Sequence, residues 1–531
     1  MADISENLIG KLIEEKGRIH KDRVFLFFED QKITYEHLDL VSNQFAHGLI
    51  NLGIQKGDKV VIMMQNHPDF LYAWFGMAKL GAVEVPINTA YKGDSLSYIV
   101  NNSDSKLLFI DAPLLERLLI IRNDLTKLNR IVCRGPMNET ISNSIPVPII
   151  SIDEFFKGSS DPLKGDISRT DPMAILYTSG TTGLSKGVVL CHNAFIHLAR
   201  VMGGYRQLGS QDVLYTFLPL FHGNAQMLAM TTALVADAQV VLRERFSASV
   251  FWDEIRKYGA TQFNYLGAVM TILSKQAPRK DDADNPVRIA FGAACPPDVM
   301  RHMEERFRLI CLEGYGLTEA GIVTHWTVND RKIGSCGKVI HDFYEVKLVD
   351  DADMEVPVGG IGEIVVRPKA PFIMMSEYYK MPEKTLDSYQ NLWFHTGDYA
   401  RRDEEGYFYF VDRKKDALRR RGENISSFEV EKVINSHPRV LESAVFAVPS
   451  ELGEDEVKAN VVLKAGEILP PEELIRYCND RMAYFAIPRY LEFVSELPKT
   501  PTNRVEKYRL RQAGITKNTW DREKAGIKIT R

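Results

Sequence analysis

The chain has 531 residues, more than a single hydrophobic core usually supports, so two or more domains are expected. Its content of 45% hydrophobic and 26% charged residues is typical of a folded, water-soluble protein. Lys and Arg total 66 and Asp and Glu total 70, which gives a net charge of -4. This balance argues against a protein that binds nucleic acid or an anionic membrane through bulk charge.

The first residues, MADISENLIGKLIEEKGR, mix charged and apolar side chains as a surface helix does. They lack the basic start and apolar block of a signal peptide, and no run of about 18 apolar residues follows that could span a membrane. The six cysteines have no CxxC or metal-ligand spacing, which argues against structural zinc and suits a reducing compartment. We therefore expect a cytoplasmic protein without a transmembrane segment.

From about residue 24 to residue 300, short apolar runs alternate with longer amphipathic ones, as in DKVVIMM followed by DFLYAWFGMAKLGA. This alternation predicts βαβ units and largely parallel sheets. After about residue 330 the chain changes to β-rich stretches with turns, such as YEVKLVDDADMEVPVGGIGEIVVR. The predicted fold class is α/β, with a large N-terminal domain of βαβ-type sheets that ends in a β-rich subdomain.

Residues 412–426, DRKKDALRRRGENIS, are strongly basic and poor in apolar side chains, which is typical of a domain junction. Beyond them the pattern indicates helix, strand, strand, helix and strand, as in a small α+β domain. We therefore predict an N-terminal domain over residues 1–414 and a small C-terminal domain over residues 415–531.

Residues 178–187, TSGTTGLSKG, place glycines, small hydroxyl side chains and one lysine between two apolar runs. Backbone N–H groups that approach closely, hydroxyls and a cation together bind a phosphate-type oxyanion. The stretch is not a Walker motif, because Ser185 precedes Lys186 and Gly187 follows it. A strand, GVVL, is expected next, so the loop joins two strands. A flexible surface turn is the competing interpretation.

Three further clusters carry polar side chains that suit a nucleotide. YGLTEAG at 315–321 places the hydroxyl of Thr318 beside the carboxylate of Glu319, a ligand type that Mg²⁺ prefers. TGD at 396–398 and DRKKD at 412–416 supply Asp398 and Arg413, and a carboxylate can accept both hydroxyls of a ribose. PKTPTNRVEKYRLR at 498–511 leads into a basic helix. Each cluster alone is compatible with an ordinary turn or a solvated charged face.

In this order and with these spacings, the clusters resemble the adenylate-forming superfamily of acyl- and aryl-CoA ligases, luciferases and peptide-synthetase adenylation domains. The stretches RRRGENISSFEVEKVI and GITKNTWDREKAG are similar to the crotonobetaine/carnitine-CoA ligase-like group. The resemblance implies an acid–thiol ligase that uses ATP and Mg²⁺ to convert a carboxylic acid into an acyl-adenylate and pyrophosphate. Coenzyme A (CoA) then displaces AMP to give the thioester. The acids implied are carnitine- or crotonobetaine-like, or short- to medium-chain.

The resemblance also implies roles for individual residues. The β- and γ-phosphates would be cradled by Thr178, Ser179, Gly180, Thr181, Thr182, Gly183 and Lys186. The α-phosphate would contact Thr318, and Glu319 would hold Mg²⁺. The adenine and ribose would be bound by Gly292, Ala293, Ala294, Tyr315, Gly316, Asp398 and Arg413. The small domain would swing about a hinge at Lys415, and the CoA channel would be faced by Gly422, Glu423 and Asn424.

The acyl group would be bound, by the same resemblance, near Phe221, His222, Gly223, Tyr265, Gly316 and Leu317. His222 matches a position that gates this pocket in relatives, although a buried core histidine is the competing interpretation. A trimethylammonium substrate would want an aromatic or acidic cage. Phe221, Tyr265 and Trp326 could supply one, and they could equally form a plain hydrophobic wall.

The chain departs from the family pattern at two positions. The lysine that reaches the site during adenylation aligns with Arg504, in the pair Asn503-Arg504, and an arginine is a planar fork instead of a compact ammonium. Lys507 lies three residues on, on the same helical face if a helix begins near Asn503. Either Arg504 or Lys507 is the candidate catalytic cation. Arg421 replaces the first glycine of the CoA-channel segment.

Two other functions compete with a CoA ligase. An adenylation enzyme would load a carrier protein in place of CoA, and a non-catalytic relative would bind nucleotide without turning it over. The expected partners are small molecules, namely the acid, ATP and CoA, with no nucleic acid. A homodimer is left open.

Overall fold

The computed structural model describes residues 8–178, 185–413, 418–420, 423–449, 455–479, 481–482, 486–499, 505–527 and 529. The chain divides into two units, which are described separately. The first comprises Met1–Thr178, Ser185–Glu345 and Arg367–Ser388, and the second comprises Ser179–Leu184, Val346–Val366 and Tyr389–Arg531. Within the described part of the chain, no helix is long and apolar enough to cross a membrane.

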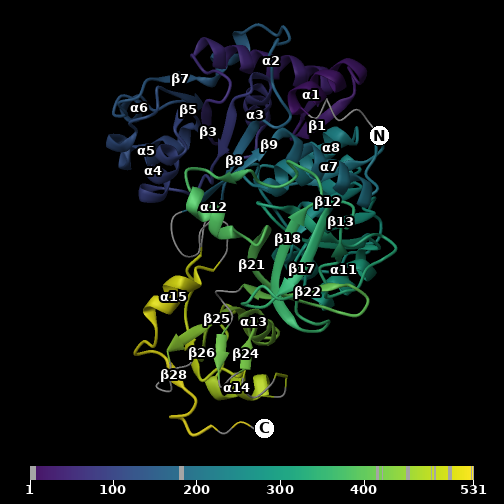
Figure 1. Ribbon diagram of the computed structural model, residues 1–531, viewed down its shortest axis with the longest axis vertical. Helices are drawn as coiled ribbons and strands as arrows, with labels where there is room; N and C mark the ends of the chain where they lie inside the picture. Colours follow the sequence, from purple (N-terminus) through teal and green to yellow (C-terminus); the bar gives the residue numbers. More distant parts are fainter. Residues whose placement is uncertain are drawn as a thin grey trace. The chain divides into compact units, whose positions relative to one another are not determined.

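The described residues of the first unit form a nine-stranded sheet (Figure 1). All neighbouring strands from β14 to β1 are parallel, whereas β15, β16 and β2 pair antiparallel at the two edges. In spatial order the strands are β16 (Lys338–Val339), β15 (Gly321–His325), β14 (Ile310–Leu317), β13 (Ile289–Ala293), β12 (Gln262–Leu266), β10 (Val213–Thr216), β11 (Gln239–Leu242), β1 (Val24–Phe28) and β2 (Gln31–Thr34).

A second sheet of the first unit has eight strands among the described residues. The strands from β8 to β7 are parallel, and β9 and β19 join them antiparallel at one edge. In spatial order they are β19 (Glu377–Tyr378), β9 (Lys186–Cys191), β8 (Pro172–Thr178), β4 (Val83–Pro86), β3 (Lys59–Met63), β5 (Ser105–Asp111), β6 (Arg130–Arg134) and β7 (Ile149–Ser151).

Helices alternate with the strands of both sheets, which confirms the predicted α/β class. They are α1 (Ile9–Ile19), α2 (Tyr35–Asn51), α3 (Pro68–Leu80), α4 (Gly93–Asn102), η2 (Ala112–Leu114), α5 (Leu115–Ile120), η3 (Arg122–Asp124), α6 (Glu139–Ser142), η4 (Ile152–Lys157), α7 (His192–Tyr205), η5 (Asn224–Thr231), α8 (Thr232–Val235), α9 (Phe251–Tyr258), α10 (Gly267–Ser274), α11 (Pro297–Phe307) and α12 (Pro382–Ser388).

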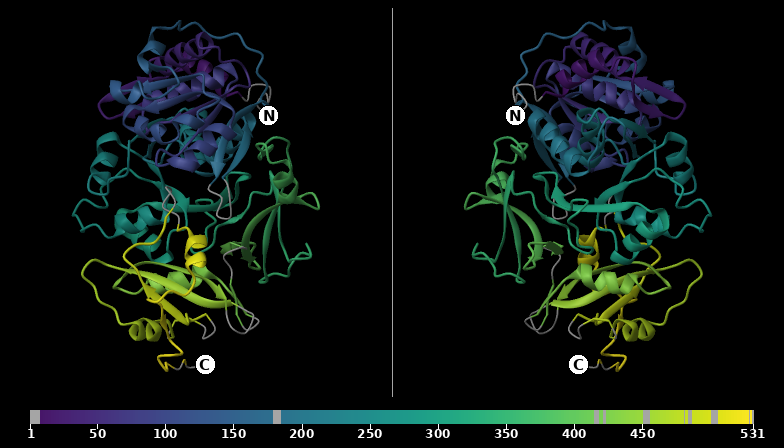
Figure 2. Two further views of the ribbon diagram at one scale, coloured as in Figure 1. Left: turned by 90° about the vertical axis from the view of Figure 1, so that its left-hand side faces the viewer. Right: turned by 90° about the vertical axis from the view of Figure 1, so that its right-hand side faces the viewer.

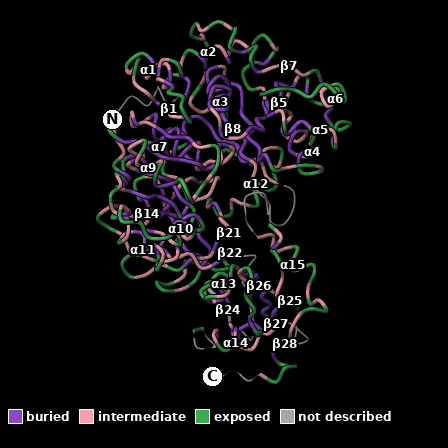
Figure 3. The backbone as a smooth tube through the Cα atoms, turned by 180° about the vertical axis from the view of Figure 1, so that it is seen from behind, coloured by how far each residue is buried: buried purple, intermediate pink, exposed green. Residues whose placement is uncertain are grey.

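The core of the first unit lies on its parallel strands and on the helices that separate the two sheets. Helix α3 is buried along almost its whole length (Figure 3), because apolar side chains occupy all its faces. Helix α7 contacts β9 of one sheet and β15 of the other. The segment η5 is hydrogen-bonded to β4 and to β12, so it also connects the sheets.

The second unit begins with the predicted β-rich subdomain, a five-stranded sheet among the described residues. Its strands are β17 (Tyr344–Val349), β18 (Ile361–Pro368), β20 (Tyr389–Gln390), β21 (Trp393–Arg402) and β22 (Phe408–Arg413). A two-stranded hairpin follows, made of β23 (Leu418–Arg420) and β24 (Glu423–Ile425).

The C-terminal part of the second unit, lime to yellow in Figure 2, is the predicted small α+β fold. The expected order of helix, strand, strand, helix and strand is confirmed, and α15 and β28 follow it. The elements are α13 (Ser427–Asn435), β25 (Val440–Pro449), β26 (Asp455–Leu463), α14 (Pro471–Asn479), β27 (Tyr490–Phe493), α15 (Lys507–Ala513) and β28 (Trp520–Asp521). The predicted boundary between residues 414 and 415 lies outside the described residues, so it stays a prediction.

Candidate functional site

The two strands that flank the Gly/Ser/Thr loop end opposite each other. Thr178 is the last residue of β8 and Lys186 is the first of β9, and the antiparallel register pairs these two residues directly. The Thr178 hydroxyl donates to the Lys186 carbonyl oxygen over 3.4 Å. The prediction that the loop joins two strands is therefore confirmed. Its central residues lie outside the described residues: Ser179, Gly180, Thr181, Thr182 and Gly183.

Thr318 and Glu319 lie in the turn between β14 and β15, and both side chains are half-buried. The turn is tight because Gly316 lies against the opposite strand, where a Cβ atom would come within 2.2 Å of the Gly321 carbonyl oxygen. Gly321 adopts φ +70°, a left-handed conformation that glycine reaches without strain. The hairpin thus presents a hydroxyl and a carboxylate side by side.

Tyr378 connects Glu319 with Lys186. Its hydroxyl donates to Glu319 Oε1 over 2.8 Å, and the Lys186 ammonium lies over its ring, 4.4 Å from the centroid. The Tyr378 side chain is buried, with 3% of its surface exposed. The structure therefore brings the predicted phosphate-binding lysine and the predicted metal-binding carboxylate onto one tyrosine.

The predicted adenine segment lies at the carboxyl end of β13, beside β14. Ala293 ends β13, and Ala294 follows with φ +60°. Gly292 leaves no room for a side chain, because a Cβ atom would come within 2.4 Å of the Tyr265 carbonyl oxygen. Tyr315 lies on β14 with 8% of its surface exposed. The backbone here is closely packed against Tyr265, and the adenine-binding role of the segment stays a prediction.

The Glu313 side chain is hydrogen-bonded to this segment. Its Oε1 accepts a hydrogen bond from the Cys295 backbone N–H over 2.7 Å and one from the Tyr265 hydroxyl over 3.3 Å. Burial raises the pKa of Glu313 to about 7, and these two hydrogen bonds only partly oppose that shift. The carboxyl that binds the Cys295 N–H, next to the predicted adenine segment, therefore has a pKa near neutral pH.

The predicted acyl-binding residues precede η5, which is a π-helix over Asn224–Thr231. Phe221, His222 and Gly223 are half-buried, and the rings of Phe221 and His222 lie 4.7 Å apart. Helices of the π type are rare and occur most often at functional sites. The hydroxyls of Thr231 and Thr232 satisfy carbonyl groups inside the wide turn. The acyl-binding role of this region stays a prediction.

The side chain of Glu84, on β4, is a buried carboxyl that contacts the first turn of η5. Gln226 Nε2 donates to Glu84 Oε2 over 3.1 Å, and both side chains are fully buried. Burial raises the pKa of Glu84 well above its usual value, and the hydrogen bond from Gln226 opposes this shift. Glu84 pairs with Ala174 on β8, two residues before Leu176, and Leu176 lies beside Gly223. A buried carboxyl therefore lies close to the predicted acyl-binding segment.

The proposed aromatic cage has two members that are fully buried. Tyr265 donates its hydroxyl to Glu313 and to the Leu312 carbonyl oxygen, and the Trp326 indole N–H donates to Ser335 Oγ over 2.8 Å. Phe221 is the more exposed member of the three. Leu317, also expected near the acyl group, ends β14 and is half-buried.

Within the second unit, Asp398 and Arg413 lie opposite each other. The register of β21 and β22 pairs the two residues, and Arg413 Nε is 3.7 Å from Asp398 Oδ1. Asp398 follows Gly397, whose backbone N–H donates to Glu363 Oε1 over 2.9 Å. The structure thus brings together the two residues that were predicted to bind the ribose.

Lys507, one of the two candidate cations, is ion-paired in the second unit. Its ammonium lies 2.8 Å from Glu431 Oε1 and donates to Ser427 Oγ over 2.5 Å. Ser427 is itself held by Asp412, whose Oδ2 accepts from its backbone N–H and its hydroxyl. Burial raises the pKa of Glu431, an effect that Lys507 opposes. Helix α15 begins at Lys507. Asn503 and Arg504 lie outside the described residues, so a shared helical face for Arg504 and Lys507 is not tested.

Several predicted residues lie outside the described residues. The structure describes the backbone of Glu423 and Asn424 as part of β24, and their side chains are not described. The roles predicted for these residues therefore stay predictions: Arg504, Lys415, Gly422 and the side chains of Glu423 and Asn424.

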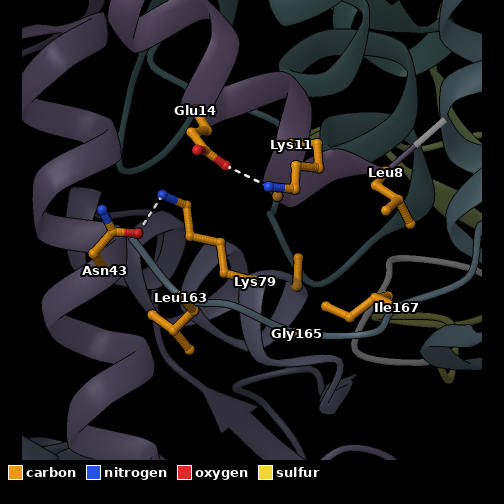
Figure 4. Close-up of a pocket in the computed structure, with 10 residues that line it drawn as sticks. Leu8, Lys11, Glu14, Asn43, Lys79, Leu163, Gly165 and Ile167 are labelled. Atoms are coloured by element: carbon orange, nitrogen blue, oxygen red, sulfur yellow. Dashed lines mark hydrogen bonds and ion pairs between the residues drawn. The ribbon is translucent and has the colours of Figure 1, made fainter. Parts of the chain in front are cut away.

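A separate hollow lies among α1, α2, α3 and residues 163–167 (Figure 4). Lys79 extends into it and donates to Asn43 Oδ1 over 2.6 Å, and it also forms an ion pair with Asp39. Burial lowers the pKa of Lys79, although Asp39 opposes this shift. Because these groups hold its ammonium, we interpret the Lys79–Asp39 contact as a buried structural ion pair.

Sequence reasoning missed Tyr378, Glu313 and Glu84. Glu313 and Glu84 carried a weak signal, because each is a lone acid inside an apolar strand, RLICLEGYG and GAVEVPI. Tyr378 carried none, because its partners are 59 and 192 residues away and only the fold brings them together.

The chain matches known proteins along most of its length. Residues 13–379 match the family model described as AMP-binding enzyme, and residues 429–504 match the AMP-binding enzyme C-terminal domain. A crotonobetaine/carnitine–CoA ligase from Salmonella heidelberg is 32% identical over 517 residues, which cover 95% of this chain and 98% of the relative.

Solved structures with the same fold include an anthranilate CoA ligase, AuaEII, in complex with anthranoyl-AMP. It has a TM-score of 0.86 and 26% identity, and the match covers 95% of this chain and 97% of that chain. ATP-bound MatB from Rhodopseudomonas palustris has a TM-score of 0.83 and 25% identity, with 96% and 98% covered.

Proposed function

The chain belongs to the AMP-binding enzyme family and is an AMP-forming acyl-CoA synthetase of the adenylate-forming class, and from this premise we propose how its residues act. We propose that it joins a small carboxylic acid to CoA at the expense of ATP. The observation that carries the proposal is that Tyr378 contacts both Lys186 and Glu319, and Thr318 precedes Glu319 in the same turn. A cation, a hydroxyl and a carboxylate at the ends of two strand pairs form a site for a polyphosphate and a divalent metal ion.

The residues fit Mg²⁺ in their chemistry. Protein-bound Mg²⁺ usually takes one or two carboxylates and completes its shell with phosphate oxygens and water. Glu319 offers a half-buried carboxylate whose Oε1 is already oriented by Tyr378. When bound there, Mg²⁺ supplies positive charge that neutralises the phosphates of ATP. Glu319 would hold it and Thr318 would orient the α-phosphate.

The reaction has two steps in this proposal. A carboxylate oxygen of the acid attacks the α-phosphorus of ATP, and the bond from that phosphorus to the pyrophosphate oxygen breaks. The CoA thiolate then attacks the acyl carbon, and AMP leaves with the electron pair of the acyl–oxygen bond. Lys186 would stabilise the departing pyrophosphate, and either Lys507 or Arg504 would stabilise the charge that develops on the phosphoryl centre.

For the acid itself, we infer a short carboxylate with a polar or cationic far end. Glu84 and Gln226 place two polar groups in a region that a purely aliphatic substrate would leave apolar. Removing a proton from Glu84 would give a carboxylate that matches a trimethylammonium group, as carnitine and crotonobetaine carry. An apolar short- to medium-chain acid is the competing substrate, and Met227 and Leu228, both buried on η5, suit it.

A matched pair of acids tests the substrate. Crotonobetaine and its neutral isostere, in which a tert-butyl group replaces the trimethylammonium group, should differ in kcat/KM by at least tenfold in favour of the cation. Glu84→Gln should abolish that preference and leave the isostere unaffected. Equal rates with both acids would refute the cationic substrate. A panel of aliphatic and aromatic acids, read by AMP release, would then identify the alternative.

The acceptor is tested by mass spectrometry. With ATP, Mg²⁺, a competent acid and CoA, we expect an acyl-CoA thioester and one AMP per thioester. Acyl-adenylate that accumulates and does not react with CoA would instead favour a carrier protein as acceptor. Nucleotide binding without AMP release for any acid would favour a non-catalytic relative.

A further inference from the structure

Tyr378 has a position that the proposed reaction does not yet explain. Strand β19 pairs antiparallel with β9, and the register places Tyr378 opposite Val188. Side chains of paired residues lie on the same face of a sheet, and so do those of residues two apart on one strand. Tyr378 and Lys186 therefore lie on one face, and their diagonal contact brings the ammonium over the ring at 4.4 Å.

The backbone around Tyr378 is fixed on both sides. Ser376 N–H donates to the Val189 carbonyl oxygen over 2.9 Å, and Tyr379 N–H donates to the Gly187 carbonyl oxygen over 2.8 Å. The Tyr378 N–H donates to Thr385 Oγ1 of α12 over 2.9 Å. The backbone that carries the tyrosine is thus fixed by hydrogen bonds to β9 and α12.

The same segment also binds the turn that carries Glu319. The Met375 N–H donates to the Glu319 carbonyl oxygen over 2.7 Å, and the Tyr378 hydroxyl donates to Glu319 Oε1 over 2.8 Å. A hydrogen bond from a buried hydroxyl to a carboxylate orients it and is stronger than one between neutral groups. Glu319 is therefore held by its backbone and by its side chain.

We propose that Tyr378 is a positioning residue that couples the two phosphate-directed groups, its hydroxyl orienting Glu319 toward the metal ion and its ring holding Lys186 beside the phosphates. The inference rests on the proposed function and goes beyond it, because it assigns Tyr378 a role through Glu319 and Lys186. Partners in the outer shell of a metal site typically change metal affinity by 10- to 100-fold when they are lost. The two halves of Tyr378 should therefore have separable effects.

Two substitutions separate the hydroxyl from the ring. Tyr378→Phe removes the hydrogen bond to Glu319 and keeps the ring under Lys186, whereas Tyr378→Leu removes both. Tyr379→Phe is the matched control, because this neighbouring hydroxyl donates to Asp104 Oδ2 over 2.8 Å and not to Glu319. Thermal unfolding of all three variants shows whether the fold is kept.

The primary readout is metal binding and not turnover. Binding of Mn²⁺ to the full chain in the presence of ATP is measured by electron paramagnetic resonance, and binding of AMP without metal is measured by calorimetry. We expect Tyr378→Phe to weaken Mn²⁺ binding about tenfold, with AMP binding unchanged. Tyr378→Leu should in addition weaken the binding of metal-free ATP, and Tyr379→Phe should match the wild type in every measurement.

A double-mutant cycle makes the test independent of general destabilisation. On a Glu319→Gln background, Tyr378→Phe should have little further effect on Mn²⁺ affinity, because the two residues act as one unit. If the wild type binds Mn²⁺–ATP and Tyr378→Phe binds Mn²⁺ with the same affinity, the inference is overturned and the proposed function stands. A wild type that shows no metal-dependent ATP binding would overturn both. Additive effects in the cycle would also refute the coupling.

Discussion

The positive charges in the two units are held in different ways. In the first unit, Lys186 lies over the ring of Tyr378, on paired strands whose register is fixed by backbone hydrogen bonds, and the hydroxyl of the same tyrosine donates to Glu319. In the second unit, Lys507 is bound to Glu431 and Ser427 of α13. The first arrangement is organised before a ligand arrives, whereas Lys507 must exchange a carboxylate for a phosphate oxygen if it is the adenylation cation. Substitutions in the two regions should therefore produce different losses.

The largest effect is expected at Lys507. If its ammonium stabilises the transition state of adenylation, Lys507→Ala should slow that step by about a thousandfold. Thioester formation from a supplied acyl-adenylate should be largely retained. Adenylation is followed by pyrophosphate release in the absence of CoA, and thioester formation is followed by thioester release from supplied acyl-adenylate and CoA, with Arg504→Ala as the matched variant.

A packing loss could imitate this result, because Lys507→Ala leaves Glu431 buried without its ion pair. The double variant Lys507→Ala/Glu431→Gln removes that buried charge and serves as the control. Normal adenylation in Lys507→Ala would exclude Lys507 as the cation. If Arg504→Ala then loses the activity, the role belongs to Arg504.

A smaller effect on the rate of adenylation, about a hundredfold, is expected when Lys186 is removed. Lys186→Ala should slow adenylation because the charge on the departing pyrophosphate is no longer balanced. AMP has no β- or γ-phosphate, so its binding should be nearly unchanged. Single-turnover rates and calorimetric AMP affinities check this separation, and equal losses in both would contradict the assigned role.

The stability of the protein should depend on pH through the buried carboxyl of Glu313. The pKa of Glu313 is raised from 4.5 to about 7, so the folded state holds a proton that the unfolded state has lost between these values. The contribution of this group to stability is complete below about pH 4.5 and is lost as pH rises through about 7. Glu313→Gln should remove this loss, which amounts to about 2 kcal/mol between about pH 5 and pH 7.

Urea unfolding of wild type and Glu313→Gln over this pH range measures the effect. The amide keeps an acceptor for the Cys295 N–H, so the variant tests charge more than shape. Parallel pH profiles of the two proteins would show that Glu313 does not titrate in this range.

The smallest effect is expected at Tyr265, whose hydroxyl donates to Glu313 over 3.3 Å. Tyr265→Phe keeps the ring packing and removes one hydrogen bond, which should cost about 1 kcal/mol of unfolding free energy near neutral pH. The apparent pKa of Glu313 should also rise, because a bond to its charged form is lost. A fall in that pKa would contradict the assigned hydrogen bond.

The comparison also shows how far sequence reasoning reaches. Local patterns predicted the βαβ units, the strand that begins at Lys186 and the order of elements in the C-terminal fold, because each depends on the periodicity of neighbouring residues. The pairing of Asp398 with Arg413 was consistent with the family resemblance. The contact of Tyr378 with Glu319 depends on the tertiary pairing of β19 with β9, which no local pattern encodes.

The buried acids left only a weak signal in the sequence. Glu313 and Glu84 look like ordinary acids in the sequence, and only their burial raises the pKa values and makes them candidates for a pH response and for substrate selection. The π-helix at η5 is set by packing between two sheets, since Asn224 contacts β12 and Gln226 contacts β4. Its sequence, NAQMLAMT, would suit an ordinary α-helix.

The central claim is that this chain activates a carboxylate by forming an acyl-adenylate. The most direct test is the exchange of labelled pyrophosphate into ATP, measured with Mg²⁺ and without CoA over a panel of carboxylic acids. We predict exchange that depends on both the metal ion and a particular acid, and that is reduced about a hundredfold in Lys186→Ala. Exchange that is absent for every acid, or that proceeds equally without one, would contradict the account.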